Sequence, residues 1–211
     1  MIKRLLITVL IAMACLEWSV GCVSVTKIAY SKPTTSDREW RDIGKNSFAT
    51  EGVKLLLLPG NMRITRFAGP LLPLFPYWGA YDKSPFRMII GLYLEMDDIN
   101  VDPKSVLVAV DKDIRIGPSR LIGPASFQDN CGAGDDPNDG NPIQGEVLAS
   151  KDSCLVLVFD VAPPPPDRSF SVTIDGLRTR NKPLPPLIVH FGKAESKWLW
   201  GFCSTPVLEL E

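Results

Sequence analysis

The sequence predicts an all-β protein built from two packed antiparallel sheets. Several short segments alternate apolar and polar residues with a period of two, as strands with one buried face do. The chain also contains 19 prolines and carries no long helical pattern. Short strands joined by frequent turns are usually arranged as two packed sheets. The fold class expected is therefore an antiparallel β-sandwich.

Phe86–Asp97 is the clearest strand. Arg87, Gly91, Tyr93, Glu95 and Asp97 occupy one face, on which Ile89 is the apolar exception. The opposite face is apolar throughout and is formed by Phe86, Met88, Ile90, Leu92, Leu94 and Met96. We expect that second face to be buried, because successive side chains of a strand point to opposite sides of the sheet.

Other segments have the length and composition of strands. Cys154–Val161 is apolar on both faces and should be central, whereas the prolines of 163–166 should lie outside the sheet. Met62–Phe67 should return as a hairpin arm after Pro59-Gly60, and Trp198–Phe202 should add an edge or lid strand. The remaining strands are expected at Lys54–Leu58, Val106–Asp111, Ile114–Ile116, Arg120–Ile122, Ser169–Asp175 and Leu187–Phe191.

The segment Gly69–Gly79 carries a proline at every third position, Pro70, Pro73 and Pro76. In a polyproline II helix these prolines share one edge, which is typical of a ligand for an aromatic groove or of an exposed patch near a membrane. The alternative, which we favour, is an irregular segment whose Leu, Phe and Trp side chains are buried in the domain.

The first 22 residues are typical of an export signal. Lys3 and Arg4 precede an apolar run over 5–14, which has the length of a signal-peptide core. Glu17 ends this run too early for a membrane-spanning helix, which needs about 20 apolar residues. The alternatives are an uncleaved membrane anchor over Leu5–Val25 and cleavage after Ala14 without a lipid.

Ser19-Val20-Gly21-Cys22 resembles the lipobox of bacterial lipoproteins, in which small residues precede a cysteine that becomes lipidated. Ala12-Met13-Ala14-Cys15 is the competing match, and neither has the usual Leu three residues before the cysteine. The resemblance implies an acylated (diacylglycerol and palmitate) Cys22 and membrane attachment through that lipid. It also implies a place in the bacterial cell envelope, at the outer membrane and facing the periplasm.

We therefore expect three regions: a signal peptide over 1–21, a lipidated cysteine and polar tether over 22–46, and a β-sandwich domain over 47–211. Within the tether, Ser36 and Glu39 have capping-box spacing and predict one short helix. The stretch from Phe159 through the prolines to Leu177 resembles uncharacterised bacterial lipoproteins with immunoglobulin-like domains. That resemblance implies an immunoglobulin-like sandwich and transfers no functional residue.

The net charge of the chain excludes one class of partner, and its cysteines predict a disulfide. The formal net charge is −1 without a basic stripe, so nucleic acid is not an expected partner. Cys131, Cys154 and Cys203 remain downstream of Cys22, and disulfides persist in exported proteins. We expect Cys131 and Cys154 to pair, because both lie in or beside a long turn region; three free buried thiols are the alternative.

The acidic region Phe127–Gly145 offers a calcium hypothesis. Asp135, Asp139 and Glu146 have the spacing of positions 1, 5 and 12 of an EF-hand loop, but Pro137 occupies position 3. A solvated turn explains the same residues, because Asp, Asn, Gly and Pro are the residues that turns select. The sequence predicts no cofactor, and calcium stays an alternative.

The chain contains a single histidine, His190, expected on a strand and facing opposite to Val189 and Phe191. A hydrolase triad would need a nucleophile and an acid beside it, and no Gly-x-Ser-x-Gly motif supplies the nucleophile. The expected function is a non-enzymatic structural or protein-interaction module of the cell envelope. A calcium- or ligand-binding β domain is the alternative, and a hydrolase is the weaker one.

Overall fold

The computed structural model describes residues 23–35, 37–69, 75–81, 85–95, 98–111, 114–132, 136, 138–179, 182–192 and 195–202. The chain divides into two compact units. The terminal unit comprises Met1–Ala29, Arg63–Ala80 and Ser196–Glu211, and the main unit comprises Tyr30–Met62 and Tyr81–Glu195. The expected signal helix, Cys15 and Cys22 lie outside the described residues.

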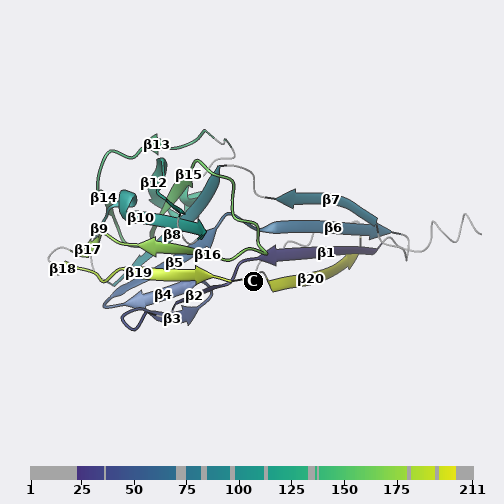
Figure 1. Cartoon of the computed structure of the whole chain (residues 1–211), viewed down its shortest axis with the longest axis horizontal. Helices are drawn as coiled ribbons and strands as arrows, with labels where there is room; N and C mark the ends of the chain where they lie inside the picture. Colours follow the sequence, from purple (N-terminus) through teal and green to yellow (C-terminus); the bar gives the residue numbers. More distant parts are fainter. Residues whose placement is uncertain are drawn as a thin grey trace, which may run out of the picture. The chain divides into compact units, whose positions relative to one another are not determined.

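The terminal unit is a four-stranded sheet in the order β20-β1-β6-β7. β1 and β6 pair antiparallel over seven residues, from Val23 opposite Gly69 to Ala29 opposite Arg63. In Figure 1, β1 and β7 run in one direction and β6 and β20 in the other. The strands are β20 (Glu195–Phe202), β1 (Val23–Tyr30), β6 (Arg63–Gly69) and β7 (Phe75–Tyr81).

The main unit contains three antiparallel sheets. The first has seven strands: β13 (Asn141–Pro142), β12 (Arg120–Ser126), β15 (Ser153–Phe159), β8 (Phe86–Leu94), β5 (Val53–Pro59), β4 (Ser47–Thr50) and β3 (Arg41–Gly44). The second has five: β11 (Ile114–Ile116), β10 (Val106–Asp111), β16 (Phe170–Ile174), β19 (Leu187–Phe191) and β2 (Pro33–Thr35). The third has four: β14 (Val147–Ala149), β9 (Ile99–Val101), β17 (Leu177–Thr179) and β18 (Lys182–Pro183).

Two short 3-10 helices, η1 (Pro103–Ser105) and η2 (Phe127–Gly132), complete the described elements. The main unit thus confirms the all-β prediction. No helix among the described residues has the length and apolarity needed to cross a membrane.

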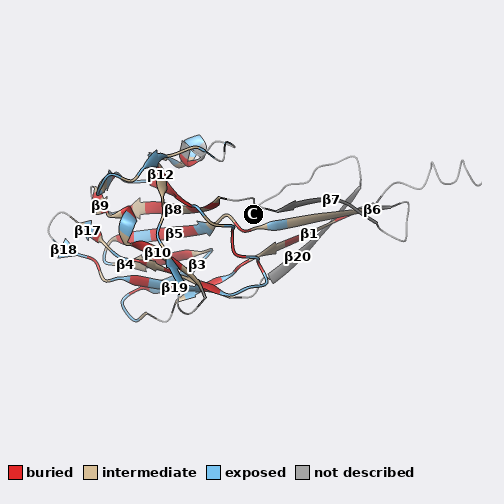
Figure 2. Cartoon of the chain, turned by 45° about the horizontal axis from the view of Figure 1, so that its top comes forward, coloured by how far each residue is buried: buried red, intermediate tan, exposed pale blue. Residues whose placement is uncertain are grey.

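Residues of all three sheets share one core. Alternate residues of β8, β16 and β19 are buried, as the period-2 patterns predicted. Trp40 is also in this core, and its indole N–H donates to the carbonyl oxygen of Pro185 at 3.0 Å. Figure 2 shows the buried residues concentrated in strands such as β8 and β5.

The central position expected for Cys154–Val161 is confirmed. All seven residues of β15 are buried, and the strand lies between β12 and β8. Its outward residues Cys154 and Val156 form a second, smaller cluster with Cys131, on the face opposite the main core. Ile89, Ile122 and Phe127 pack against this cluster. Both faces of the seven-stranded sheet are therefore covered around β15.

The structure corrects the expectation for residues 22–46. Instead of a tether, this stretch supplies β1, β2 and β3, so it contributes strands to both units. The short helix expected near Glu39 is replaced by bends at 38–40 that lead into β3. The hairpin expected at Met62–Phe67 is also wrong, because β6 pairs with β1 and not with β5.

Other strand predictions hold. β5, β10, β11, β12 and β19 lie where they were expected. The proline run 163–166 is outside every sheet, and β20 is an edge strand. In the Gly69–Gly79 segment, residues 75–79 belong to β7, which replaces the irregular segment expected there, and 70–74 lie outside the described residues.

Candidate binding groove

The main unit carries a broad open groove of about 1200 Å³. Five separate parts of the chain line it: the 39–43 stretch that includes β3, the β4–β5 turn, the end of β8, the turn before β15, and the residues from β18 to Pro185. The lining residues are Glu39, Arg41, Ile43, Ala49, Thr50, Glu51, Gly52, Val53, Lys54, Tyr93, Leu94, Glu95, Lys151, Asp152, Lys182, Pro183, Leu184 and Pro185.

Strand pairing fixes one wall of the groove. β5 and β8 place Lys54 directly opposite Tyr93 and Val53 opposite Leu94. Glu95 then donates its backbone N–H to the carbonyl oxygen of Gly52 at 2.9 Å, which ties the β4–β5 turn to the end of β8. This turn therefore has a defined position, although it is on the surface.

Two charged contacts cross the groove lining. The ammonium of Lys182 lies 2.9 Å from Oε2 of Glu51, and both side chains are about two-thirds exposed, at 65% and 69%. The ammonium of Lys54 lies 5.0 Å from the centre of the Tyr93 ring. Exposed ion pairs typically contribute only about 0–1 kcal/mol, so a ligand with its own charges can replace the Lys182–Glu51 pair at little cost.

The groove lining has balanced charge and little catalytic chemistry. Its four acids and four bases are Glu39, Glu51, Glu95, Asp152, Arg41, Lys54, Lys151 and Lys182. Apolar side chains such as Ile43 and Leu184 separate them, and no histidine, cysteine or serine is among the lining residues. This mixture of apolar contacts and both charge signs is suited to a polypeptide surface.

His190 is exposed on β19, between the buried Val189 and Phe191, as predicted. Ser171 and Thr34 are its cross-strand partners, and its carbonyl oxygen accepts a hydrogen bond from the Thr34 hydroxyl at 3.2 Å. His190 is not among the residues that line the groove.

The structure joins Cys131 and Cys154, the pair expected from the sequence, with a Cα–Cα distance of 5.4 Å. Cys131 lies near the end of η2 and Cys154 lies on the central strand β15. The bridge therefore fastens the 3-10 helix to the outer face of the sheet. The bridge is buried in the second cluster, which indicates a structural role for both cysteines.

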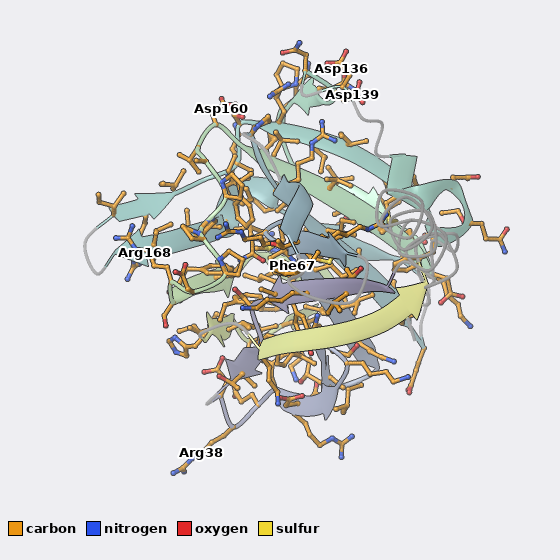
Figure 3. All side chains as sticks on the ribbon, turned by 90° about the vertical axis from the view of Figure 1, so that its right-hand side faces the viewer. Arg38, Phe67, Asp136, Asp139, Asp160 and Arg168 are labelled. Atoms are coloured by element: carbon orange, nitrogen blue, oxygen red, sulfur yellow. A yellow bond between two sulfur atoms is a disulfide. The ribbon has the colours of Figure 1, made fainter. Side chains whose placement is uncertain are left out.

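The calcium candidates are only partly described. Asp135 lies outside the described residues. The Asp139 backbone N–H donates to the Asp136 carbonyl at 3.1 Å, and Figure 3 shows these two residues on the loop that follows η2. Glu146 forms an exposed ion pair with Arg178 at 3.5 Å. Within the described part of the chain, no group of three or more His, Cys, Asp or Glu side chains has the arrangement of a metal site.

Sequence reasoning missed the groove. Its residues come from segments that are far apart in sequence, and the first of them lies in the stretch expected to be a tether. No local motif marks them, because residues such as Lys54 and Tyr93 become neighbours only through the pairing of β5 with β8.

The chain matches no protein-family model, and neither a curated protein nor a solved structure is detectably similar to it.

Proposed function

We propose that the chain is an exported, lipid-anchored envelope protein whose main unit binds another protein in the groove and catalyses no reaction. The observation that carries the binding role is the groove itself, with four acids and four bases distributed among apolar residues. Complementary charges on a partner give specificity and faster association, and the apolar residues between them supply contact area.

The anchor part of the proposal rests on the first 22 residues. An apolar core followed by Gly21-Cys22 supports lipidation of Cys22, and the Cys131–Cys154 disulfide is in keeping with an exported protein. The partner is then a protein of the same compartment, which we take to be the periplasm-facing side of the outer membrane.

We also infer that the main unit is an immunoglobulin-like sandwich. Its five- and seven-stranded antiparallel sheets contribute to one core, which supports the inference. The disulfide differs from that of antibody domains, because it lies in the outer cluster instead of joining two sheets across the core. The main unit therefore resembles an immunoglobulin domain in the packing of its two sheets and not in its disulfide. An experimental structure that shows how the strands are connected tests this inference.

Site-specific photo-crosslinking in intact cells tests the binding role. A photoreactive residue at Thr50 or Lys151, both in the groove lining, should give the same protein adduct. The control position is Lys104, which is exposed on η1 and outside the groove lining. Equal adducts from Lys104, or none from the two groove positions, would contradict the proposal.

A charge exchange within the groove sharpens this test. Glu51→Lys combined with Lys182→Glu keeps an ion pair but reverses the charge at each position. The adduct should then be strongly reduced while thermal stability stays close to that of the native chain. An undiminished adduct would show that the partner does not recognise the charges of the groove.

A further inference from the structure

Tyr93 is the aromatic residue among the described residues that line the groove. It lies on the outer face of β8, is half-buried, and pairs across the sheet with Lys54 of β5. Tyrosine is enriched among the residues that carry most of the binding energy of protein interfaces, because its ring offers a large contact area and few side-chain torsions must be ordered. Tyr93 is therefore the lining residue best suited to anchor a bound protein.

A second aromatic residue, outside the groove lining, contacts the ring of Tyr93. Phe127, the first residue of η2, stacks on this ring with the two ring centres 5.0 Å apart. Phe127 itself has little room to move, because its ring occupies the space next to Gly91 that a side chain at that position would fill. The position of Phe127 therefore limits the orientations that are open to the Tyr93 ring.

The disulfide holds Phe127 in turn. Phe127 packs against the small outer cluster that contains Cys131 and Cys154. Cys131 follows Phe127 by four residues in the same 3-10 helix, and Cys154 lies directly opposite Gly91 in the pairing of β15 with β8. The bridge therefore closes η2 onto the pair of strands next to which the Phe127 ring lies.

We infer that Tyr93 is the anchor residue of the groove, and that Phe127 and the Cys131–Cys154 bridge position its ring before the partner protein binds. The inference deepens the proposed function and rests on it for the presence of a protein partner. A side chain that is already ordered in the free protein loses less conformational entropy on association, so the same contacts give a higher affinity. The bridge thus contributes to binding although neither cysteine lines the groove.

Photo-crosslinking from a photoreactive residue at Thr50 in intact cells measures the anchor role. Tyr93→Ala should reduce the yield of the partner adduct about tenfold or more, as truncation of an anchor residue does. Tyr93→Phe should retain most of the adduct, because it keeps the ring and removes only the hydroxyl. The matched control is Ile89→Ala, which should leave the yield close to that of the native chain. Ile89 is half-buried on the same face of β8 but lies outside the groove lining.

Separate variants measure the positioning role. Phe127→Leu keeps an apolar side chain in the outer cluster but removes the stacked ring, and Cys131→Ala with Cys154→Ala removes the bridge. Each should lower the adduct yield about fivefold, the order of the cost of ordering one side chain on association. Each should also raise the rate at which hydroxyl radicals modify Tyr93 in the full chain, measured by mass spectrometry, because Phe127 no longer covers the ring.

Two further variants control for a general loss of stability. Ile122→Val trims the same outer cluster from β12, and Val172→Ala leaves a cavity in the main core at β16. Neither residue lines the groove, so both variants should keep the adduct yield and the Tyr93 modification rate near their native values. If Phe127 and the bridge acted only through stability, a comparable loss of stability in Val172→Ala would have the same effects.

The outcomes separate this inference from the proposed function. A native adduct that persists in Tyr93→Ala would overturn the anchor role and leave the binding groove supported. An undiminished adduct in Phe127→Leu, or an unchanged Tyr93 modification rate in that variant, would overturn the positioning role. The absence of any adduct from the native chain would contradict the proposed function, and the anchor role with it.

Discussion

The ring of Phe127 lies directly over the Cα of Gly91. A Cβ atom added at Gly91 would lie 2.9 Å from Cε1 of Phe127, closer than such atoms approach in proteins. The same ring stacks on Tyr93 with 5.0 Å between centroids and an interplanar angle of 12°. Glycine on the outer face of β8 therefore makes room for the aromatic residue that begins η2.

Gly91→Ala should destabilise the chain by about 1–3 kcal/mol, the usual cost of overpacking a filled site. The cause would be displacement of Phe127, so Phe127→Ala in the Gly91→Ala background should cost less than it does alone. Urea unfolding of the four chains measures this coupling. Gly145→Ala is the control, because nothing lies within 4 Å of a Cβ added there; equal effects at the two glycines would rule out the steric explanation.

Removal of the disulfide should lower the free energy of unfolding. The bridge joins residues 23 apart, and on the chain-entropy model a loop of this length contributes roughly 3 kcal/mol. Cys131→Ala with Cys154→Ala, or reduction of the native chain, should therefore shift the urea midpoint in the same direction. Peptide mapping of unreduced, alkylated protein checks the pairing, and alkylation of both cysteines would show that the bridge is absent.

Leu92 lies on β8 and Glu95 directly follows that strand. Leu92 is fully buried, whereas Glu95 is exposed. Leu92→Ala should cost about 2–5 kcal/mol, because it leaves a cavity in the core. Glu95→Ala should change stability by less than about 0.5 kcal/mol. Val172→Ala and Thr173→Ala on β16 should differ in the same sense. Thermal melts that do not separate the members of each pair would contradict the assigned buried faces.

Asn61 is a buried polar residue that ties together three segments. Its side-chain amide donates to the Ser31 hydroxyl at 2.9 Å and to the Pro164 carbonyl at 3.1 Å. Asn61→Ala would leave both acceptors without this donor, and should cost about 1–3 kcal/mol. The exposed Asn141 provides the control, since Asn141→Ala should have a small effect in the same urea titration. Equal losses of unfolding free energy in the two variants would contradict a stabilising role for the buried hydrogen bonds of Asn61.

Cys22 should carry the lipid. Metabolic labelling with an acyl-chain analogue should mark the native protein and the Cys15→Ala variant but not the Cys22→Ala variant. Loss of the label in Cys15→Ala alone would move the processing site to Cys15. A label retained in both variants, or absent from the native protein, would contradict the lipoprotein assignment.

Much of the main unit was predictable because local patterns decide it. In β8 and β16 the apolar residues recur at every second position, and the structure buries those faces. β15 was recognisable as a central strand from apolar residues on both faces, and it is buried throughout. In each case the buried face of a strand can be recognised from the apolar positions of that strand alone.

The terminal unit could not be predicted in the same way. β1 buries Val25 on one face and Ile28 on the other, so its sequence shows no clean alternation. Four strands lie between β1 and its partner β6 in the sequence, and pairing at such a distance leaves no local signal. The groove was not predicted for a related reason, since Glu51 and Lys182 are 131 positions apart in the sequence and meet only in the folded chain.

The adjacency of β20 and β1 has a consequence for the timing of folding. β1, the first described strand, cannot complete its pairing until β20, the last strand, has been synthesised, because β20 is its outer neighbour in the sheet. Contacts of such long sequence separation form late and slowly. A chain cut short before Glu195 would therefore contain every strand of the three sheets of the main unit and still leave one edge of β1 without its partner strand.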